Sequence, residues 1–184
     1  MRKIWESFRL SAAELHNVRS LASVAVLIAV NLALSKVNVY ITPEERVSVS
    51  FLATACIGML FGPVMGMSAG FVCDIVSFIS NPQPAPYFPG YTITAMMGGL
   101  LYGLCLYRRE LTTWRAFAAV ISVSLICNIC LNSLWSSILY AKAIYLLLPV
   151  KIIKNLLLLP FKALLLYTVC SQVQTLYQRV RARL

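Results

Sequence analysis

Long apolar segments separated by short polar connections constrain the fold of this chain more than any other feature of its sequence. A helix needs about 20 mainly apolar residues to cross the hydrocarbon core of a bilayer. Segments near that length cover residues 18–34, 47–61, 64–79, 91–107, 117–139 and 150–173. We therefore predict an all-α fold, an integral membrane bundle of six transmembrane helices.

The overall composition indicates the same class of protein. Of the 184 residues, 60% are hydrophobic and only 12% are charged, and the mean hydropathy is +0.79. A soluble domain is nearer half apolar and a quarter charged, so this chain lacks the polar side chains to cover a water-exposed surface. Six spans also use most of its length, which leaves no room for a separate soluble catalytic domain.

The basic residues predict how the bundle is oriented. The formal net charge is +10, and Lys and Arg gather in the cytoplasmic loops of membrane proteins. With the N-terminus inside, most basic residues fall on inner segments, and the outer loops hold only Lys36, Arg46 and Lys142. Six spans then place both termini in the cytoplasm, and we expect no nucleic-acid partner. We assign an amphipathic cytoplasmic segment to residues 1–17, the transmembrane domain to 18–177 and a basic cytoplasmic tail to 178–184.

The sequence lacks the side chains that catalysis within a membrane requires. His16 is the only histidine and precedes the first span, so no span can present a histidine base to a nucleophile. Asp74 is the only acid within a predicted span, and no phosphate-binding Gly-Lys-Ser/Thr motif occurs. The six cysteines lie in apolar segments, where free cysteine packs as a small hydrophobe. We expect no enzyme activity, metal or cofactor, which leaves binding, conduction, transport or scaffolding.

The last apolar segment carries a polar stripe formed by Lys151, Lys154, Asn155 and Lys162. At 100° per residue, three of the four fall within about 40° of one another, and Lys154 lies about 60° to the other side. Lys151 and Lys154 either reach the outer headgroups or form a cationic pocket for an anionic ligand. Lys162 lies about 16 Å further along the helix, where it needs a partner such as Asp74 or a water-filled cavity.

The segment 117–139 has a polar face of its own. Ser124, Asn128, Asn132 and Trp135 follow at spacings of four, four and three residues, which places them on one side of a helix. Asparagines inside a bundle can hydrogen-bond to neighbouring helices. Alternatively, two amides and an indole beside a lysine-bearing helix could bind a planar polar ligand with an acidic tail.

A proline-rich stretch, SNPQPAPYFPGYT at residues 80–92, interrupts the apolar segments. Each proline removes a backbone donor and fixes its own φ, so neither a helix nor a central strand can pass through. An interfacial aromatic belt accounts for some of the nearby rings. Because a stiff loop loses little ordering entropy on binding, we interpret this stretch as a lid whose Tyr87, Phe88 and Tyr91 can stack on a flat ligand.

The first span has a stripe of small residues, Ala25, Ala29 and Ala33, at every fourth position. Small residues at this spacing let another helix approach closely. The stripe predicts either internal packing of the bundle or docking onto a partner membrane subunit.

Together these features resemble the substrate-binding S component of the energy-coupling factor (ECF) vitamin transporters. The similarity covers size, six spans, inner termini, the alanine stripe and outer binding loops. The stretches FGPVMGMSAGFVCDIVSF…YFPGYTITAMMGGLLYG (61–103) and LPVKIIKNLLLLPFKALLL (148–166) are most similar to the folate-specific S components, and the Phe-Pro-Gly-Tyr-Thr segment is the most specific part.

The resemblance implies a subunit that binds a vitamin outside and docks through its first helix onto a transmembrane coupling protein carried by two cytoplasmic ATPases. It also implies the plasma membrane of a prokaryote, with folate or a related pterin as ligand. The candidate substrate-binding residues are Lys151, Lys154, Asn155, Asn128, Asn132, Trp135, Tyr87, Phe88, Tyr91, Thr94 and Arg46. Ala25, Ala29 and Ala33 are the candidate docking residues, and Asp74 and Lys162 are candidate buried charges.

Two alternatives stay open from the sequence. The first is an S component for another ligand, such as riboflavin, pantothenate or a nucleobase-like precursor, which a different pocket chemistry would select. The second is a membrane scaffold without a ligand, for which neutral substitutions of Lys151 and Lys154 would leave function intact.

Overall fold

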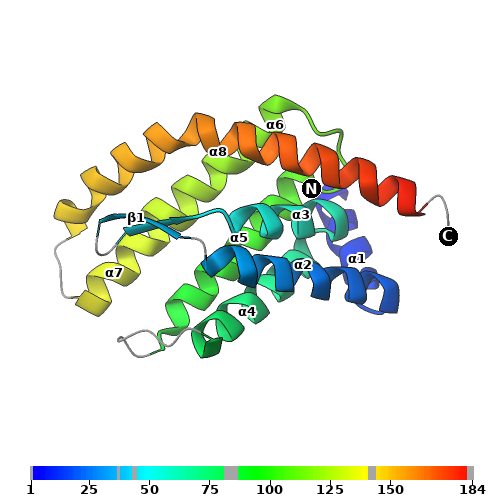
Figure 1. Ribbon diagram of the computed structural model, residues 1–184, viewed down its shortest axis with the longest axis horizontal. Coiled ribbons are helices and arrows are strands. Elements are labelled where there is room, and N and C mark those ends of the chain that lie inside the picture. Colours follow the sequence, from blue (N-terminus) through cyan, green and yellow to red (C-terminus); the bar gives the residue numbers. More distant parts are fainter. Residues whose placement is uncertain (1, 37, 43–44, 81–86, 141–143, 182–184) are drawn as a thin grey trace.

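The computed structural model in Figure 1 describes residues 2–36, 38–42, 45–80, 87–140 and 144–181. Helices make up most of this part of the chain. In order, they are α1 (Arg2–Glu14), α2 (Val18–Lys36), α3 (Phe51–Phe61), α4 (Pro63–Ser80), α5 (Pro89–Leu106), α6 (Thr113–Val123), the π-helix η1 (Ser124–Leu131), α7 (Asn132–Tyr140) and α8 (Ile144–Arg181). Each apolar segment of the sequence contains a helix, and α6, η1 and α7 follow one another without a break.

Four stretches of helix in the described ranges are long and apolar enough to cross a membrane. They are Val18–Lys36, Pro63–Ser80, Thr113–Leu139 and Lys151–Arg179. The helix α3 is apolar but has only 11 residues, which at 1.5 Å per residue is about half the thickness of a bilayer core. The prediction of a helical membrane protein is confirmed in this coarse form.

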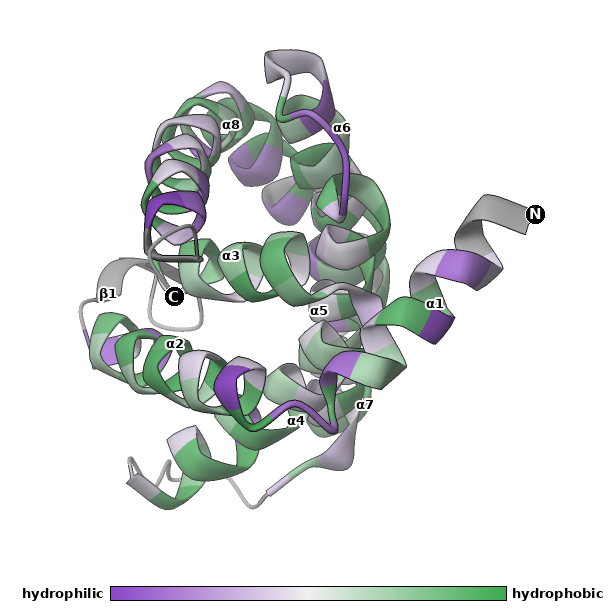
Figure 2. Cartoon of the chain, turned by 90° about the vertical axis from the view of Figure 1, so that its right-hand side faces the viewer, coloured by the Kyte–Doolittle hydropathy of each residue, from purple (hydrophilic) through white to green (hydrophobic). Residues whose placement is uncertain are grey.

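The helices run roughly along the long axis of the molecule (Figure 1). The helix α1 and the end of α8 lie toward the right of the figure, whereas β1, α7 and the beginning of α8 lie at the opposite end. Figure 2 shows mainly hydrophobic helices, with hydrophilic stretches on α1 and on the turn before α6. That turn includes the exposed residues Arg108 and Arg109, so basic groups of separate segments gather toward one end.

A short β-hairpin stands where the sequence predicted only a loop. The strands β1 (Asn38–Thr42) and β2 (Glu45–Ser48) pair antiparallel, with Val39 opposite Val47. The β-branched and aromatic residues of this stretch favour strands. The stretch was predicted as a loop because it is a short polar connection between two apolar segments. The hairpin is a small addition to the helical fold that the sequence did not predict, and α3 begins at Phe51 rather than at residue 47.

A buried serine joins α1 to the turn between α3 and α4. The Ser11 hydroxyl donates to the Phe61 carbonyl at 2.7 Å and accepts from the backbone N–H groups of Val64 at 3.1 Å and Met65 at 3.3 Å. Gly62 in this turn has φ 91°, and a Cβ there would lie 2.7 Å from the Ser11 side chain. The N-terminal helix thus satisfies donors at the start of α4 that have no partner within that helix.

Glycines let α4 and α5 pack backbone against backbone. A Cβ on Gly99 would lie 2.1 Å from the Gly66 carbonyl oxygen, and a Cβ on Gly70 would lie 2.5 Å from that of Ala95. Such close approach of small residues is a main source of helix association in membranes. The contact fixes the wall of the bundle on which the polar residues of α4 and α5 are displayed.

We expect Gly99→Ala to lower the thermal unfolding midpoint of the purified chain in detergent, because its methyl group would overlap the backbone of α4. Overpacking of this kind costs about 1–3 kcal/mol. Gly98→Ala is the matched control, since a Cβ at Gly98 meets nothing within 4 Å. Equal midpoints for the two variants would contradict the close packing of α4 on α5.

Candidate functional site

A cavity of about 440 Å³ lies among the helices and is lined by residues of elements from α2 to α8. Its lining is rich in amide, hydroxyl and charged groups, which a membrane bundle does not bury without a reason. The volume lies within the range of about 300–1,000 Å³ that is typical of small-molecule sites. The polar residues that line it include Asn31, Asp74, Thr94, Asn128, Asn132, Lys154, Asn155 and Lys162.

Lysine and amide groups of α7, η1 and α8 form one hydrogen-bonded cluster. Lys151 is only 4% exposed, and its ammonium donates to Asn132 Oδ1 at 2.9 Å and to Ser136 Oγ at 3.1 Å. Asn155 donates to the Lys151 carbonyl at 2.9 Å, and Asn128 donates to Asn155 Oδ1 at 3.3 Å. Because Asn128, Asn132 and Asn155 also line the cavity, this cluster fixes which amide atoms the cavity wall presents.

The segment that carries the amides contains a π-helix. The eight residues of η1, Ser124–Leu131, include Ser124, Cys127 and Asn128, all of which line the cavity. A π-helical turn is wider than an α-helical one and often occurs at functional sites. Ser124 and Asn128 of the predicted polar face do line the cavity, but the π-helix was not predicted, because the prediction used α-helical spacing throughout the segment.

An aromatic corner forms where α5 begins. The rings of Phe88 and Trp135 meet edge to face at 5.6 Å, and Phe88 meets Tyr91 at 5.9 Å. Trp135 Nε1 donates to Thr94 Oγ1 at 3.0 Å. Gly90 is required between them, since a Cβ there would lie 2.3 Å from the Phe88 ring. Tyr91 and Thr94 line the cavity, so this corner joins the end of the lid to the site.

A second set of contacts links the lid segment to α4. The hydroxyl groups of Tyr87 and Thr92 are hydrogen-bonded to each other, and Thr92 donates to Asp74 Oδ2 at 2.7 Å. The Tyr87 ring also packs edge to face on Phe78 at 5.2 Å. Thr92 is 5% exposed, whereas Asp74 lines the cavity. A carboxylate on the cavity wall is therefore held in place by the segment that follows the prolines.

The structure brings most of the predicted site residues together. The cavity wall includes six of them, namely Tyr91, Thr94, Asn128, Asn132, Lys154 and Asn155, together with both candidate buried charges, Asp74 and Lys162. Lys151 does not line the cavity, but its ammonium donates to Asn132 in the wall. The Phe88 ring packs on Tyr91, and the Trp135 indole donates to Thr94, both of which line the cavity. The Tyr87 hydroxyl is hydrogen-bonded to Thr92, which in turn donates to Asp74 in the cavity wall. Arg46 belongs to β2, but its side chain and residues 81–86 of the lid lie outside the described part of the structure.

Sequence reasoning missed a polar contribution from α2 and α3. Asn31 is 7% exposed and donates to the Ser50 carbonyl and to Thr54 Oγ1, both at 2.9 Å. All three residues line the cavity. A lone asparagine in an apolar span was the available signal, since such a group is costly in a membrane without partners.

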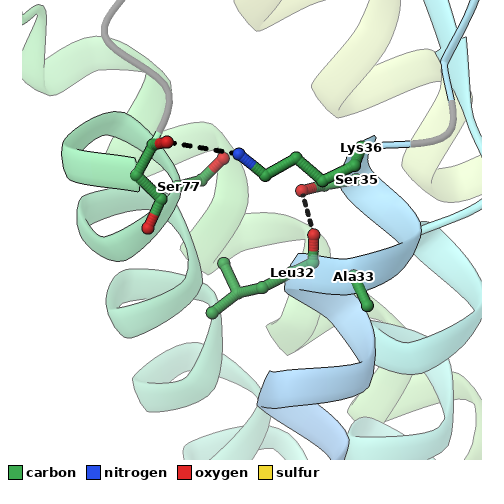
Figure 3. Close-up of a pocket in the computed structure, with 6 residues that line it drawn as sticks. Leu32, Ala33, Ser35, Lys36 and Ser77 are labelled. Carbon is green, nitrogen blue, oxygen red and sulfur yellow. Dashed lines mark hydrogen bonds between the residues drawn. The ribbon is translucent and has the colours of Figure 1, made fainter.

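A smaller hollow of about 190 Å³ lies beside the main cavity, between α2 and α4 (Figure 3). Lys36 Nζ crosses it to the Ser80 carbonyl at 3.2 Å, and Ser35 Oγ donates to the Leu32 carbonyl at 2.7 Å. Ser35 and Ser77 also line the main cavity. This hollow contains neither an aromatic ring nor a carboxylate in its described lining, so it extends the rim of the main cavity rather than forming a comparable site.

The alanine stripe lies on the outer surface of α2. Ala25, Ala29 and Ala33 are all exposed, whereas Val24 and Asn31 of the same helix are buried. Ala25 and Ala29 therefore lie away from the face used for packing within the bundle, whereas Ala33 lines the small hollow between α2 and α4.

Comparisons with known proteins agree with this architecture. Residues 19–170 match the family described as ECF transporter, substrate-specific component. The chain is 30% identical over 135 residues to the folate transporter FolT of Clostridium novyi (strain NT), an alignment that covers 73% of this chain and 78% of the relative. It is 32% identical over 152 residues to the folate transporter FolT of Leuconostoc mesenteroides subsp. mesenteroides, which covers 79% and 81% of the two chains.

A solved structure has the same fold. The crystal structure of FolT bound with folic acid matches with a TM-score of 0.78 and 30% identity, over 85% of this chain and 95% of that chain. The resemblance to S components inferred from the sequence is confirmed. The chain belongs to the family of ECF transporter substrate-specific components.

Proposed function

We propose that this chain is the folate-binding subunit of an ECF-type importer, which captures folate or a related pterin vitamin outside the cell. The observation that carries the proposal is one cavity that combines a tyrosine ring, amide groups and lysines. Its relatives are named folate transporters, and a protein with the same fold binds folic acid. The family is a transporter component and not an enzyme.

The chemistry of the cavity suits a flat ligand with an anionic tail. Tyr91 offers a ring for stacking, and Asn128 and Asn132 offer amides to a heterocycle edge. Lys154 and Lys162 place positive charge in the same space, which suits the glutamate carboxylates of folate. Lysine binds as a point charge, so the tail needs no fixed bidentate geometry.

We further propose that the bundle crosses the plasma membrane of a prokaryote six times, with both termini in the cytoplasm. Residues 1–17 and 178–184 would then be cytoplasmic, and 18–177 would form the transmembrane domain. The gathering of basic residues on α1 and on the turn before α6 supports this orientation. The hairpin and the aromatic corner, which contribute Ser48 and Tyr91 to the cavity wall, would then face outward.

The delivery step requires partners. The chain has no phosphate-binding motif for ATP, so two cytoplasmic ATPases and a transmembrane coupling subunit would supply the energy. The exposed stripe of Ala25, Ala29 and Ala33 supports docking through α2. The side of α2 that carries Val24 and Asn31 packs inward, so docking can occur without disturbing the cavity.

Isothermal titration of the purified chain in detergent, with folic acid and riboflavin side by side, tests the proposal. We expect tight one-to-one binding of folic acid and no binding of riboflavin. Binding of riboflavin alone would keep a vitamin transporter but refute the folate assignment. If a folded preparation bound neither, the ligand-free scaffold would be the better account.

A further inference from the structure

We propose that α1 is a membrane-surface helix that binds anionic phospholipid headgroups, independently of any ligand in the cavity. Three residues, Leu15, His16 and Asn17, separate the end of α1 (Arg2–Glu14) from the start of α2 at Val18. The helix α2 is long and apolar enough to cross a membrane from Val18 onward. Because a span begins where the hydrocarbon core meets the headgroups, α1 lies at that boundary.

The direction of α1 is that of a helix lying along a bilayer surface. Figure 2 looks along the long axis of the molecule, so α8 is seen nearly end-on, whereas α1 is seen from its side and projects away from the other helices. The spanning stretches of α2 and α8 run roughly along that axis (Figure 1). A helix that lies across them is parallel to the membrane plane, which is the orientation of amphipathic helices in the headgroup region.

The apolar side of α1 is only partly covered by the rest of the chain. Trp5, Phe8 and Ser11 follow at spacings of three residues, so they fall on one side of the helix. Ser11 is fully buried against the turn between α3 and α4, whereas Phe8 is half-buried and Trp5 is 77% exposed. Tryptophan is enriched where a membrane meets water, because its ring is apolar and its N–H is polar. Lipid therefore covers the end of this face that the bundle leaves open.

Arginines beside the exposed tryptophans supply the charge for an anionic headgroup. Arg9 on α1 and Arg19 in the first turn of α2 are exposed. The same pairing recurs at this end of the molecule, where Trp114 at the start of α6 is 81% exposed and follows the exposed Arg108 and Arg109. A guanidinium can donate two parallel hydrogen bonds to a phosphate. An indole next to it finds an apolar partner in the acyl chain of a phospholipid, which a free phosphate lacks.

Hydrogen bonds connect α1 to the bundle, so lipid held by α1 stabilises the whole fold. The Ser11 hydroxyl donates to the Phe61 carbonyl at 2.7 Å and accepts from two backbone N–H groups at the start of α4. Ser20, which is 4% exposed, donates to the Glu14 carboxylate and so joins α1 to α2. A ligand that binds only the folded chain raises its unfolding midpoint. Anionic lipid should therefore act as a stabilising ligand of this chain.

The first test measures the thermal unfolding midpoint of the full chain in detergent micelles that contain added phosphatidylglycerol or phosphatidylcholine. We expect phosphatidylglycerol to raise the midpoint by about 4 °C more than phosphatidylcholine does. Arg9→Gln combined with Arg19→Gln should remove most of that difference. Lys36→Gln is the matched control, because Lys36 is an exposed cation at the opposite end of α2, and it should keep the difference.

Three outcomes of this measurement would overturn the proposal. The first is the same midpoint for the wild-type chain with either lipid. The second is an equal loss of the phosphatidylglycerol effect in the double variant and in Lys36→Gln, which would make the effect a general response to net charge. The third is an equal rise with inorganic phosphate in phosphatidylcholine micelles, which would make the arginines a site for free anions rather than for lipid.

Fluorescence of Trp5 gives a second, independent test. The chain has three tryptophans, so replacing Trp114 and Trp135 by phenylalanine leaves Trp5 as the only indole. In vesicles of phosphatidylcholine and phosphatidylglycerol, lipid brominated near the headgroup end of its acyl chains should quench about half or more of the Trp5 emission, because interfacial helices bury their apolar face about 5–10 Å into this region. Iodide present on both sides of the vesicle should quench it less.

Strong quenching by iodide without quenching by brominated lipid would place Trp5 in water and overturn the proposal. Protection of Trp5 only when the proposed coupling subunit is present would assign this face of α1 to a protein partner instead of lipid, which would also overturn it. Neither measurement uses folic acid, so failure of the folate assignment would leave the lipid proposal standing, and the reverse also holds.

Discussion

Ala29→Trp should abolish folate uptake by cells that carry the complete transporter, while the purified variant still binds folic acid with wild-type affinity. Ala29 is exposed in the middle of the stripe on α2, where only small side chains let a second helix approach to backbone contact. An indole at this position would hold the partner several ångströms away. The cavity is untouched, because α2 lines it through Asn31 and Ser35 on other positions of the helix.

The experiment needs uptake and binding measured on the same variants. Ala118→Trp is the matched control, since Ala118 is an exposed alanine on α6, and it should leave both measurements unchanged. Co-purification with the proposed coupling subunit should be lost for Ala29→Trp alone. Loss of folic acid binding along with uptake would show that α2 uses the stripe for packing within the bundle, contrary to its exposure.

The apolar segments were sufficient to predict where the helices lie. The predicted segment 64–79 corresponds to α4 at Pro63–Ser80, and 91–107 corresponds to α5 at Pro89–Leu106. Proline and glycine at these ends stop or start helices by local sterics, so the sequence itself encodes the boundaries. The turn at Gly62 is equally local, since its φ of 91° favours glycine.

Features that depend on pairing between distant backbone groups could not be predicted in this way. The hairpin needs β1 and β2 to meet in register, and the π-helix η1 needs backbone hydrogen bonds one residue longer than those of an α-helix. The length and position of the apolar segments, which predicted the helices, specify neither of these hydrogen-bond patterns. The contact of Gly66 with Gly99 belongs to the same group, because it joins two helices at backbone distance.

The site was predictable by residue type but not by role. From the sequence, Lys151 and Lys154 lie on one helix, and either could bind the anionic end of a ligand. In the structure, Lys154 lines the cavity, whereas the ammonium of Lys151 is buried against Asn132 and Ser136. The difference arises from packing against α7, which no pattern within residues 150–173 could encode.

That difference leads to a contrast between the two lysines. Lys154→Ala should weaken folic acid by about 10- to 100-fold, because a charged hydrogen bond to the glutamate tail is lost. Pteroic acid, which lacks the glutamate, should bind Lys154→Ala nearly as well as it binds the wild-type chain. Lys151→Ala should weaken both ligands, since Asn132 and Ser136 would lose the donor that orients them at the cavity wall.

Titration calorimetry with both ligands on both variants distinguishes contact with the tail from support of the wall. Lys36→Ala is the control for loss of a positive charge, since Lys36 bonds to the Ser80 carbonyl beside the cavity rather than within it. A loss confined to folic acid in Lys151→Ala, with pteroic acid unaffected, would move the tail contact to Lys151. Unchanged binding in both variants would remove Lys151 and Lys154 from the site and leave Lys162 as the cavity lysine that could contact the tail.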